Sequence, residues 1–260
     1  MESSLLARLL AQFPPDSVYR RVGKWICRRL HLSASQPYYQ GIIYFDAVAQ
    51  SWAFKGTPYE VVDAQLKDTL LALSQSYQYF IDIGSNIGMI TLSILLRNKD
   101  IKAICVDPNA QVLRLLKKSL YANHLQHRAI IKNVAVGNDN GVVHFKSDIS
   151  EMGHISSNGS CVKCERLADI INEYSSQKCL IKIDVEGFET VLLQMLQQFR
   201  NMQNVCLVLE LHAFGYNEGN PQECVRLLLN SGATLRHLDG SIVSGIDSSK
   251  ITQVIASWDK

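Results

Sequence analysis

Residues 180–189 read Leu-Ile-Lys-Ile-Asp-Val-Glu-Gly-Phe-Glu, and this stretch decides the fold. Its apolar run predicts a buried strand, and Asp184, Glu186 and Gly187 follow at the carboxyl end of that strand. The stretch 79–88, Tyr-Phe-Ile-Asp-Ile-Gly-Ser-Asn-Ile-Gly, has the same order of strand, turn and helix. Two such units predict parallel strands whose carboxyl ends form one edge, which is where open α/β sheets bind their ligands.

The alternation of strand and helix patterns extends through most of the chain. It predicts an α/β protein with a Rossmann-like, mostly parallel seven-stranded sheet and helices on both faces. The predicted strands are 79–83, 101–106, 129–136, 179–184, 205–211, 233–238 and 251–258, and the main helices are 59–73, 87–97, 109–122, 188–199 and 221–230. A further strand at 141–146 and a helix at 166–174 flank a polar loop, 147–160, that is a candidate substrate lid because it is longer than most connections.

The amino-terminal segment has a different character. Helices are predicted at 3–12 and 17–31, and short strands at 41–45 and 51–54. We therefore divide the chain into a helical extension on the substrate side, 1–50, and a catalytic domain, 51–260. The second helix is basic and amphipathic, so it could make weak contact with an anionic membrane surface. We favour the alternative, in which its apolar side, which includes Val18 and Val22, packs on the main domain.

Composition and charge exclude several classes of function. The 260 residues are 47% hydrophobic with a net charge of +2, which gives no field for binding nucleic acid. No apolar run is long enough for a membrane span, and the start does not resemble a signal peptide. Seven cysteines, an odd number, favour reduced thiols and a cytoplasmic location. The pair Cys161 and Cys164 is three residues apart on a predicted strand, which favours separate thiols over a zinc site.

The glycine turn after the first strand predicts a nucleotide-containing cofactor. Gly84 and Gly88 allow a sharp turn and a close approach of the ligand. Asp82 ends the strand before this turn, and Asp107 ends the next strand, where a carboxylate can accept hydrogen bonds from a ribose. Asn86 stands where a dinucleotide fingerprint needs a glycine to make room for a pyrophosphate. S-adenosylmethionine needs no such room, and its positive charges suit the acidic surroundings.

Several motifs resemble one family of enzymes in both order and spacing. They are Phe80–Gly88, Val106–Asn109, Asn133–Gly137, Ile181–Glu189 and Val208–His212. Together they are similar to the FkbM-type methyltransferases, which use S-adenosylmethionine and of which many are thought to methylate hydroxyl groups of polyketides, sugars and other small molecules. The resemblance covers about 59–240, with Ser85 in place of the usual alanine and Asp107 in place of the commoner glutamate.

The resemblance implies a class I methyltransferase fold and a particular set of cofactor-binding residues. That set is Glu60, Asp82, Gly84, Asn86, Gly88, Asp107, Pro108, Asn133, Val134 and Asp184. It also implies a small-molecule or glycan acceptor.

An alcohol that receives a methyl group must lose its proton, so the site needs a base. The candidate catalytic residues are Asp184, Glu186, Glu210 and His212, which follow two neighbouring strands. We favour a base that acts without a metal. In the alternative, Asp184 and Glu210 bind magnesium, which acidifies the acceptor hydroxyl.

One of these candidates, His212, and the nearby Glu189 also have a simpler interpretation. His212 could be a strand-end histidine bonded to Glu210, and Glu189 an exposed acid in the first turn of a helix.

Three functions remain open from the sequence. The first is an S-adenosylmethionine-dependent O-methyltransferase, which we favour. The second is an NAD-dependent oxidoreductase, which the missing pyrophosphate glycines disfavour. The third is an inactive cofactor-binding scaffold, which the intact set of acids disfavours.

Overall fold

A computed structural model describes most of the chain. The described residues are 18, 22, 33–46, 58–147, 153–155, 159–212, 220–245 and 252–258. The predicted helix at 3–12, the strand at 51–54 and most of the helix at 17–31 lie outside these residues. None of the described helices is both long and apolar enough to cross a membrane.

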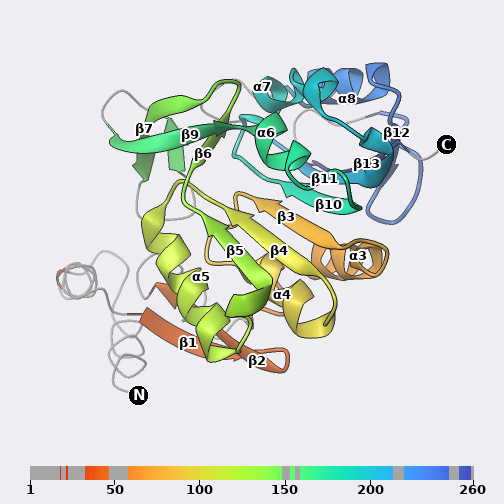
Figure 1. Cartoon of the computed structure of the whole chain (residues 1–260). Coiled ribbons are helices and arrows are strands. Elements are labelled where there is room, and N and C mark those ends of the chain that lie inside the picture. Colours follow the sequence, from red (N-terminus) through yellow and green to blue (C-terminus); the bar gives the residue numbers. More distant parts are fainter. Residues whose placement is uncertain are drawn as a thin grey trace.

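A seven-stranded sheet forms the centre of the molecule (Figure 1). Its order is β12, β13, β11, β10, β3, β4, β5. The strands are β3 (Tyr79–Ile83), β4 (Lys102–Val106), β5 (Ala129–Lys132), β10 (Cys179–Ile183), β11 (Val205–Leu211), β12 (Thr234–His237) and β13 (Thr252–Ser257). Strand β13 is antiparallel to both of its neighbours, and the other paired strands are parallel. The predicted mostly parallel, seven-stranded sheet is confirmed.

Helices cover both faces of this sheet (Figure 1). Helices α3 (Ala64–Ser74), α4 (Met89–Arg97) and α5 (Ala110–Ala122) pack on one face, and α6 (Leu167–Asn172), α7 (Glu189–Leu193) and α8 (Pro221–Asn230) on the other. Alternate residues of each strand enter the two cores: Ile81 and Ile181 face α6–α8, whereas Phe80 and Leu180 face α3–α5. The charged residues Asp82 and Lys182 share the even-numbered face, and they are direct partners in the register of β3 and β10.

Two helices begin at capping asparagines. The side chain of Asn109 accepts a hydrogen bond from the amide of Gln111 at the start of α5. Asn220 caps α8 through the amide of Glu223, and Pro221 occupies the first turn of that helix.

The prediction of one strand over 129–136 is wrong, because this stretch forms two separate strands. Strand β5 ends at Lys132, and the chain then leaves the main sheet to form β6 (Ala135–Gly137). The break occurs at Asn133, whose side-chain amide donates to the carbonyls of Asp107 and Pro108. These bonds tie the end of β5 to the loop after β4. Local strand propensity could not show this, because the partners are distant in sequence.

A second, four-stranded sheet has the order β6, β9, β7, β8. It adds β7 (Gly141–Ser147), β8 (Gly153–Ile155) and β9 (Ser160–Arg166). The predicted strand at 141–146 is confirmed, but the predicted loop at 147–160 is partly strand, because β8 pairs with β7. On β9, Cys161 is exposed and Cys164 is buried.

Shorter elements complete the described fold. The predicted helix at 188–199 is broken: α7 ends at Leu193, and a 3-10 turn follows. The 3-10 turns are Gln126–Arg128, Leu196–Gln198 and Met202–Asn204. The amino-terminal segment contributes a hairpin of β1 (Ser33–Tyr38) and β2 (Gly41–Asp46), of which only the second strand was predicted.

This hairpin packs against α5, where Ser119 and Asn123 accept hydrogen bonds from the amides of Tyr44 and Ile42 (Figure 1). Of the predicted helix at 17–31, only Val18 and Val22 are described. They are 63% and 50% exposed. The expectation that this helix packs on the main domain concerns a segment that otherwise lies outside the described residues, so it stays a prediction.

Candidate active site

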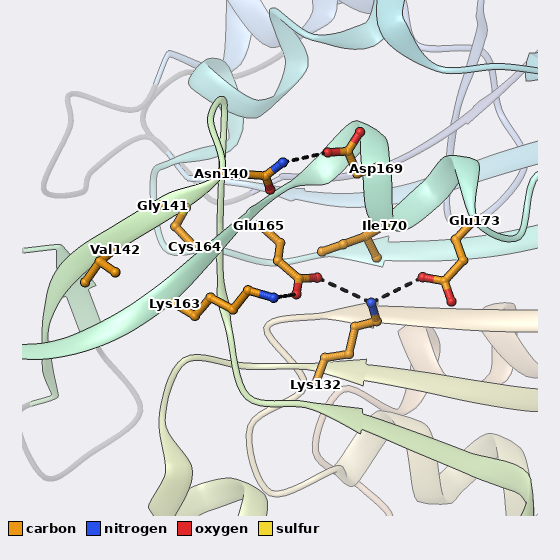
Figure 2. A pocket seen from close by; sticks show the side chains of 10 residues that line it. All are labelled: Lys132, Asn140, Gly141, Val142, Lys163, Cys164, Glu165, Asp169, Ile170 and Glu173. Carbon is orange, nitrogen blue, oxygen red and sulfur yellow. Dashed lines mark hydrogen bonds and ion pairs between the residues drawn. The ribbon is translucent and has the colours of Figure 1, made fainter.

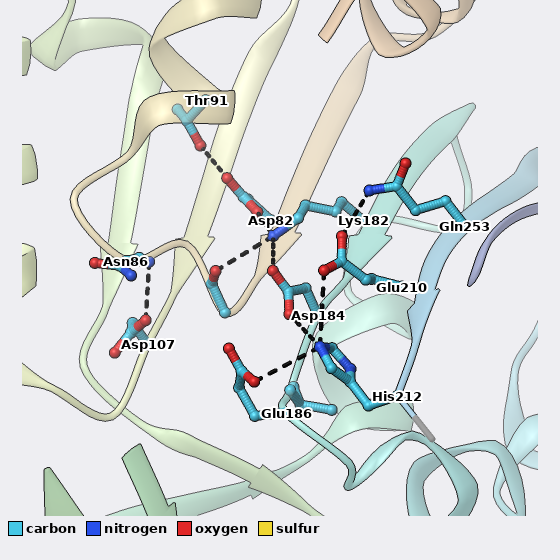
Figure 3. Close-up of polar contacts among 12 residues, drawn as sticks. Asp82, Asn86, Thr91, Asp107, Lys182, Asp184, Glu186, Glu210, His212 and Gln253 are labelled. Atoms are coloured by element: carbon cyan, nitrogen blue, oxygen red, sulfur yellow. Dashed lines mark hydrogen bonds and ion pairs between the residues drawn. The ribbon is translucent and has the colours of Figure 1, made fainter. Parts of the chain in front are cut away.

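Most of the predicted site residues gather where the winding of the sheet reverses, between β3 and β10. The chain runs from β3 outward through β4 and β5 on one side, and from β10 outward through β11 on the other. Such a reversal leaves a crevice at the carboxyl ends of the two central strands. Figure 3 shows the acidic side chains meeting there.

The glycine turn after β3 is needed for packing within the protein. Gly84 has φ of 79°, and a Cβ placed on it would collide with the carbonyl oxygen of Asp184. Gly88 has φ of 83°, and its Cβ would overlap the side chain of Leu116. A side chain at Gly84 would therefore push apart the loops after β3 and β10. The sequence analysis expected a glycine here to make room for the cofactor. The close contact with Asp184 is a second reason why this position needs a glycine.

Asp107 organises the cofactor half of the site. Its two carboxylate oxygens accept hydrogen bonds from the amides of Asn86 (2.9 Å) and Asn109 (2.8 Å). Burial raises the pKa of Asp107 to about 6, although these two amides oppose the shift. Asn133 holds the backbone of Asp107 and Pro108 from the other side, and Val134 beside it is buried. The predicted cofactor residues of the first two strands therefore lie together.

Asp82 lies beneath the turn and has 0% exposure. Its Oδ2 accepts a hydrogen bond from the hydroxyl of Thr91 (2.6 Å), and its Oδ1 lies 3.6 Å from Nζ of Lys182. Because no part of Asp82 is exposed, the structure gives this predicted cofactor residue a supporting role. It holds Lys182, which also contacts Asp184 in the second half of the site.

Lys182 lies in this site, and the sequence analysis did not single it out. Its Nζ donates to Oδ2 of Asp184 (3.0 Å) and lies near the carbonyl of Gly84 (3.5 Å). Burial opposes its charge, but the carboxylates of Asp184 and Asp82 outweigh burial and raise its pKa above the ordinary value. The available signal was a single lysine inside an apolar strand.

His212 lies at the centre of the second half of the site (Figure 3). Its Nδ1 is 3.0 Å from Oε1 of Glu189. Its Nε2 lies 3.6 Å from Glu186, 3.7 Å from Glu210 and 3.9 Å from Asp184. The structure therefore brings all four predicted catalytic residues together around one imidazole.

Glu189 differs from its sequence-based interpretation. It is only 1% exposed, whereas the sequence analysis took it as an exposed acid. Its Oε1 accepts hydrogen bonds from the amides of Val185 and Gly187, each at 3.2 Å, in addition to the contact with His212. Glu189, and not Glu210, is therefore the hydrogen-bond partner of His212. Glu210 instead accepts from Nε2 of Gln253 (2.7 Å).

The crowding of carboxyl groups shifts their protonation. Burial, with a contribution from Asp184, raises the pKa of Glu186 to about 7 and also raises that of Glu210. Burial opposes the charge on His212, but the hydrogen bond to Glu189 outweighs it and the pKa rises to about 9.

Two other polar features do not join this cluster. Glu60 accepts a hydrogen bond from the amide of Tyr39 in the β1–β2 hairpin (3.0 Å), so its described contact is with the hairpin. A separate cavity of about 520 Å³ is lined by residues of β5, β7, β9 and α6 (Figure 2). There Lys132 lies between Glu165 and Glu173, at 3.3 and 3.2 Å, so its charge is already balanced.

The acidic edge fits a positively charged cofactor. Five carboxyl groups face only two basic side chains among the residues described around Lys182 and His212. A pyrophosphate would meet repulsion here, whereas a sulfonium or ammonium group would be attracted.

Comparison with solved structures finds methyltransferases. An O-methyltransferase from Bacillus cereus in complex with SAH has a TM-score of 0.44 and 10% identity, covering 80% of this chain and 86% of that one. Precorrin-6y C5,15-methyltransferase from Geobacter metallireducens has a TM-score of 0.45 and 9% identity, covering 75% and 88%. A SAM-dependent methyltransferase from Agrobacterium tumefaciens has a TM-score of 0.46 and 10% identity, covering 87% and 70%. No curated protein matches the chain.

The family comparison is decisive. The model of the methyltransferase FkbM domain matches residues 82–237, which is more than half of the chain and spans β3 to β12. The match contains the glycine turn, Asp107 and the whole cluster around His212. The chain therefore belongs to the FkbM family of S-adenosylmethionine-dependent methyltransferases and has their class I fold.

Proposed function

We propose that this protein transfers the methyl group of S-adenosylmethionine to a hydroxyl oxygen of a small-molecule or glycan acceptor. The observation that carries the proposal is the group of carboxylates around His212, directly beside the glycine turn. A hydroxyl is a weak nucleophile until its proton is removed, so a site for O-methylation needs such a base.

Glu186 is the residue that we assign as this base. It is 33% exposed, more than Asp184, Glu210 or His212, so an acceptor can reach it. Its backbone has φ of 52°, a conformation that is uncommon for a residue with a side chain and is often found at functional sites. The proton of the acceptor would pass to a carboxylate oxygen of Glu186, and the neighbouring His212 would hold that carboxylate in place.

The other residues bind and orient. Asp107 would accept hydrogen bonds from the ribose of the cofactor, on the lone pairs that the two backbone amides leave free. The S-adenosylmethionine supplies an electrophilic methyl group when bound. Lys182 fixes Asp184 at the boundary between the two halves, so that cofactor and acceptor are held in line.

The proposal is tested with S-adenosylmethionine that carries a deuterated methyl group. The full chain is incubated with panels of sugars, glycosides, phenols and polyketide alcohols, and products are analysed by mass spectrometry. We expect the label on an oxygen atom. Transfer to nitrogen, carbon or sulfur alone would contradict the O-methyltransferase. Calorimetric binding of NAD instead of S-adenosylhomocysteine would favour the oxidoreductase, and cofactor binding without transfer to any acceptor would favour a scaffold.

We also propose a cytoplasmic location, in which a nucleotide cofactor is available. Cys105, Cys161, Cys164, Cys179 and Cys224 are free thiols, which suits a reducing compartment. Contact with an anionic membrane surface through the basic segment 17–31 stays a proposal, supported by the exposure of Val18 and Val22.

A further inference from the structure

Three side chains of the cluster direct one atom each toward a common point. They are Asp184, Glu210 and His212, and their ligand atoms all lie within 4.8 Å of one another. The three come from the ends of the adjacent strands β10 and β11, so the rigid sheet sets their spacing. Figure 3 shows the two carboxylates turned toward the imidazole.

Each of the three has its other polar atom already held by the protein. Lys182 donates to Oδ2 of Asp184, and Gln253 donates to Oε2 of Glu210. Nδ1 of His212 is bound to the buried Glu189. Metal-binding histidines commonly have their second ring nitrogen bound in this way to a carboxylate, which fixes the ring and its tautomer. The atoms left over are Oδ1, Oε1 and Nε2.

The side chain of His212 is buried, and among the described residues its Nε2 makes no hydrogen bond. The side chain is only 6% exposed, and among the described residues Nε2 has its nearest carboxylate oxygens at 3.6, 3.7 and 3.9 Å. These separations are long for a hydrogen bond. The separations of Nε2 from Glu210 (3.7 Å) and Asp184 (3.9 Å) suit ligands that share an ion, because metal–ligand bonds of about 2.1 Å place neighbouring ligand atoms between 3 and 4 Å apart.

The excess of acidic side chains in the site also favours the binding of a cation. Five carboxyl groups, those of Asp82, Asp184, Glu186, Glu189 and Glu210, surround only two basic side chains, Lys182 and His212. A divalent cation bound among them would be attracted by this excess of carboxyl groups.

We propose that Asp184, Glu210 and His212 bind one divalent metal ion, and that Mn²⁺ binds more tightly than Mg²⁺. The preference follows from the imidazole ligand, since Mg²⁺ favours oxygen ligands and retains its water. Three protein ligands leave coordination positions open for the acceptor hydroxyl. Glu186 remains outside the three and can take the proton. The catalytic role of the ion rests on the proposed function, but its binding does not.

The test uses the full chain after treatment with EDTA and removal of the chelator. Binding of Mn²⁺ is followed by the loss of the signal of the free ion in electron paramagnetic resonance, and Mg²⁺ is added as a competitor. We expect one Mn²⁺ per chain. Asp184→Asn and Glu210→Gln should each abolish or strongly weaken binding, and Glu189→Gln should weaken it about 10- to 100-fold, because it loosens the ring of His212.

Glu165→Gln is the matched control, since this acid is paired with Lys132 and Lys163 outside the cluster. It should leave Mn²⁺ binding unchanged. Glu210 is partly exposed, so its variant should stay folded, and thermal denaturation checks this. The absence of a stoichiometric site, or a site that survives both Asp184→Asn and Glu210→Gln, would overturn the inference. Equal or tighter binding of Mg²⁺ would overturn the assigned preference.

Calorimetry with S-adenosylhomocysteine in EDTA separates this inference from the proposed function. Cofactor binding without any Mn²⁺ site would contradict the metal site and leave the proposed methyltransferase function standing. A Mn²⁺ site without cofactor binding would support the metal site and contradict the proposed methyltransferase function.

Discussion

The two halves of the acidic edge are built in different ways. In the cofactor half, both carboxylate oxygens of Asp107 accept hydrogen bonds from backbone amides, and the glycine turn packs against the loop after β10. In the chemistry half, Asp184, Glu210 and His212 each have one atom held by a neighbour and another directed toward a shared centre. The first half is fixed by its backbone, and the second by side chains from several elements.

This difference separates binding from chemistry. A carboxylate held by two amides presents a fixed acceptor for a ligand. A group of carboxylates around one imidazole holds excess negative charge that a proton, a cofactor or a metal can balance. Changes in the first half should therefore act on cofactor affinity, and changes in the second on turnover.

The largest effect is expected from Glu186→Gln. The variant keeps the shape of the side chain but cannot accept the proton, so turnover should fall by about 10²- to 10⁴-fold. Single-turnover rates with a labelled methyl donor measure this. Glu173→Gln, which changes an exposed acid paired with Lys132, is the control and should keep its rate. Near-normal turnover in Glu186→Gln would remove Glu186 as the base.

Lys182→Met should cost the most stability. The lysine is buried between Asp82 and Asp184, and losing one partner of a buried ion pair costs about 3–5 kcal/mol. Urea denaturation gives the change in the free energy of unfolding. Lys178→Met removes an exposed lysine just before β10 and should change stability by less than about 0.5 kcal/mol. Equal stability of the two variants would show that the buried pairs contribute little.

Gly84→Ala should lower stability by a smaller amount. A Cβ would meet the carbonyl of Asp184, and the positive φ adds strain of about 1–3 kcal/mol. Gly141→Ala is the control, because a Cβ there meets no atom within 4 Å and its φ is not in the left-handed region. If both variants unfold at the same urea concentration as the wild type, the two halves are not packed as closely as described.

The affinity for S-adenosylhomocysteine should depend on pH through Asp107. Its pKa is raised to about 6, so the carboxylate gains a proton as the pH falls through that value. The ionised form accepts hydrogen bonds from the ribose, so affinity should be constant above about pH 7 and fall by up to about tenfold per pH unit below 6. Calorimetry between pH 5 and 8 measures this. The same dependence in Asp107→Asn would assign the titration to another group.

The sequence predicts the cofactor half better than the chemistry half. Gly84 and Asp107 each follow or end a strand in a short motif, so the sequence places both at the carboxyl edge of the sheet, although their contacts Asp184 and Asn86 lie far away in the chain. The pairing of Asn133 with the loop after β4, which breaks the predicted strand, joins residues that are distant in sequence. Local propensity carries no information about such a contact.

In the chemistry half, the sequence identifies the acids but not their partners. Glu189 reads as an exposed residue of a first helical turn, yet α7 is short and turns this side chain inward toward His212. Lys182 reads as an interruption of an apolar strand, and only the register of β3 and β10 shows that it faces Asp82. These roles depend on how strands align, which periodicity does not specify.

One measurement tests the division between the two halves most directly. At about pH 7.5, S-adenosylhomocysteine is titrated by calorimetry into the wild type, Asp107→Asn and Glu186→Gln. We predict micromolar binding to the wild type, unchanged binding to Glu186→Gln, and binding to Asp107→Asn that is weaker by about 1–3 kcal/mol, because a charge-assisted pair of hydrogen bonds is lost. Normal binding to Asp107→Asn together with loss of binding in Glu186→Gln would contradict the account.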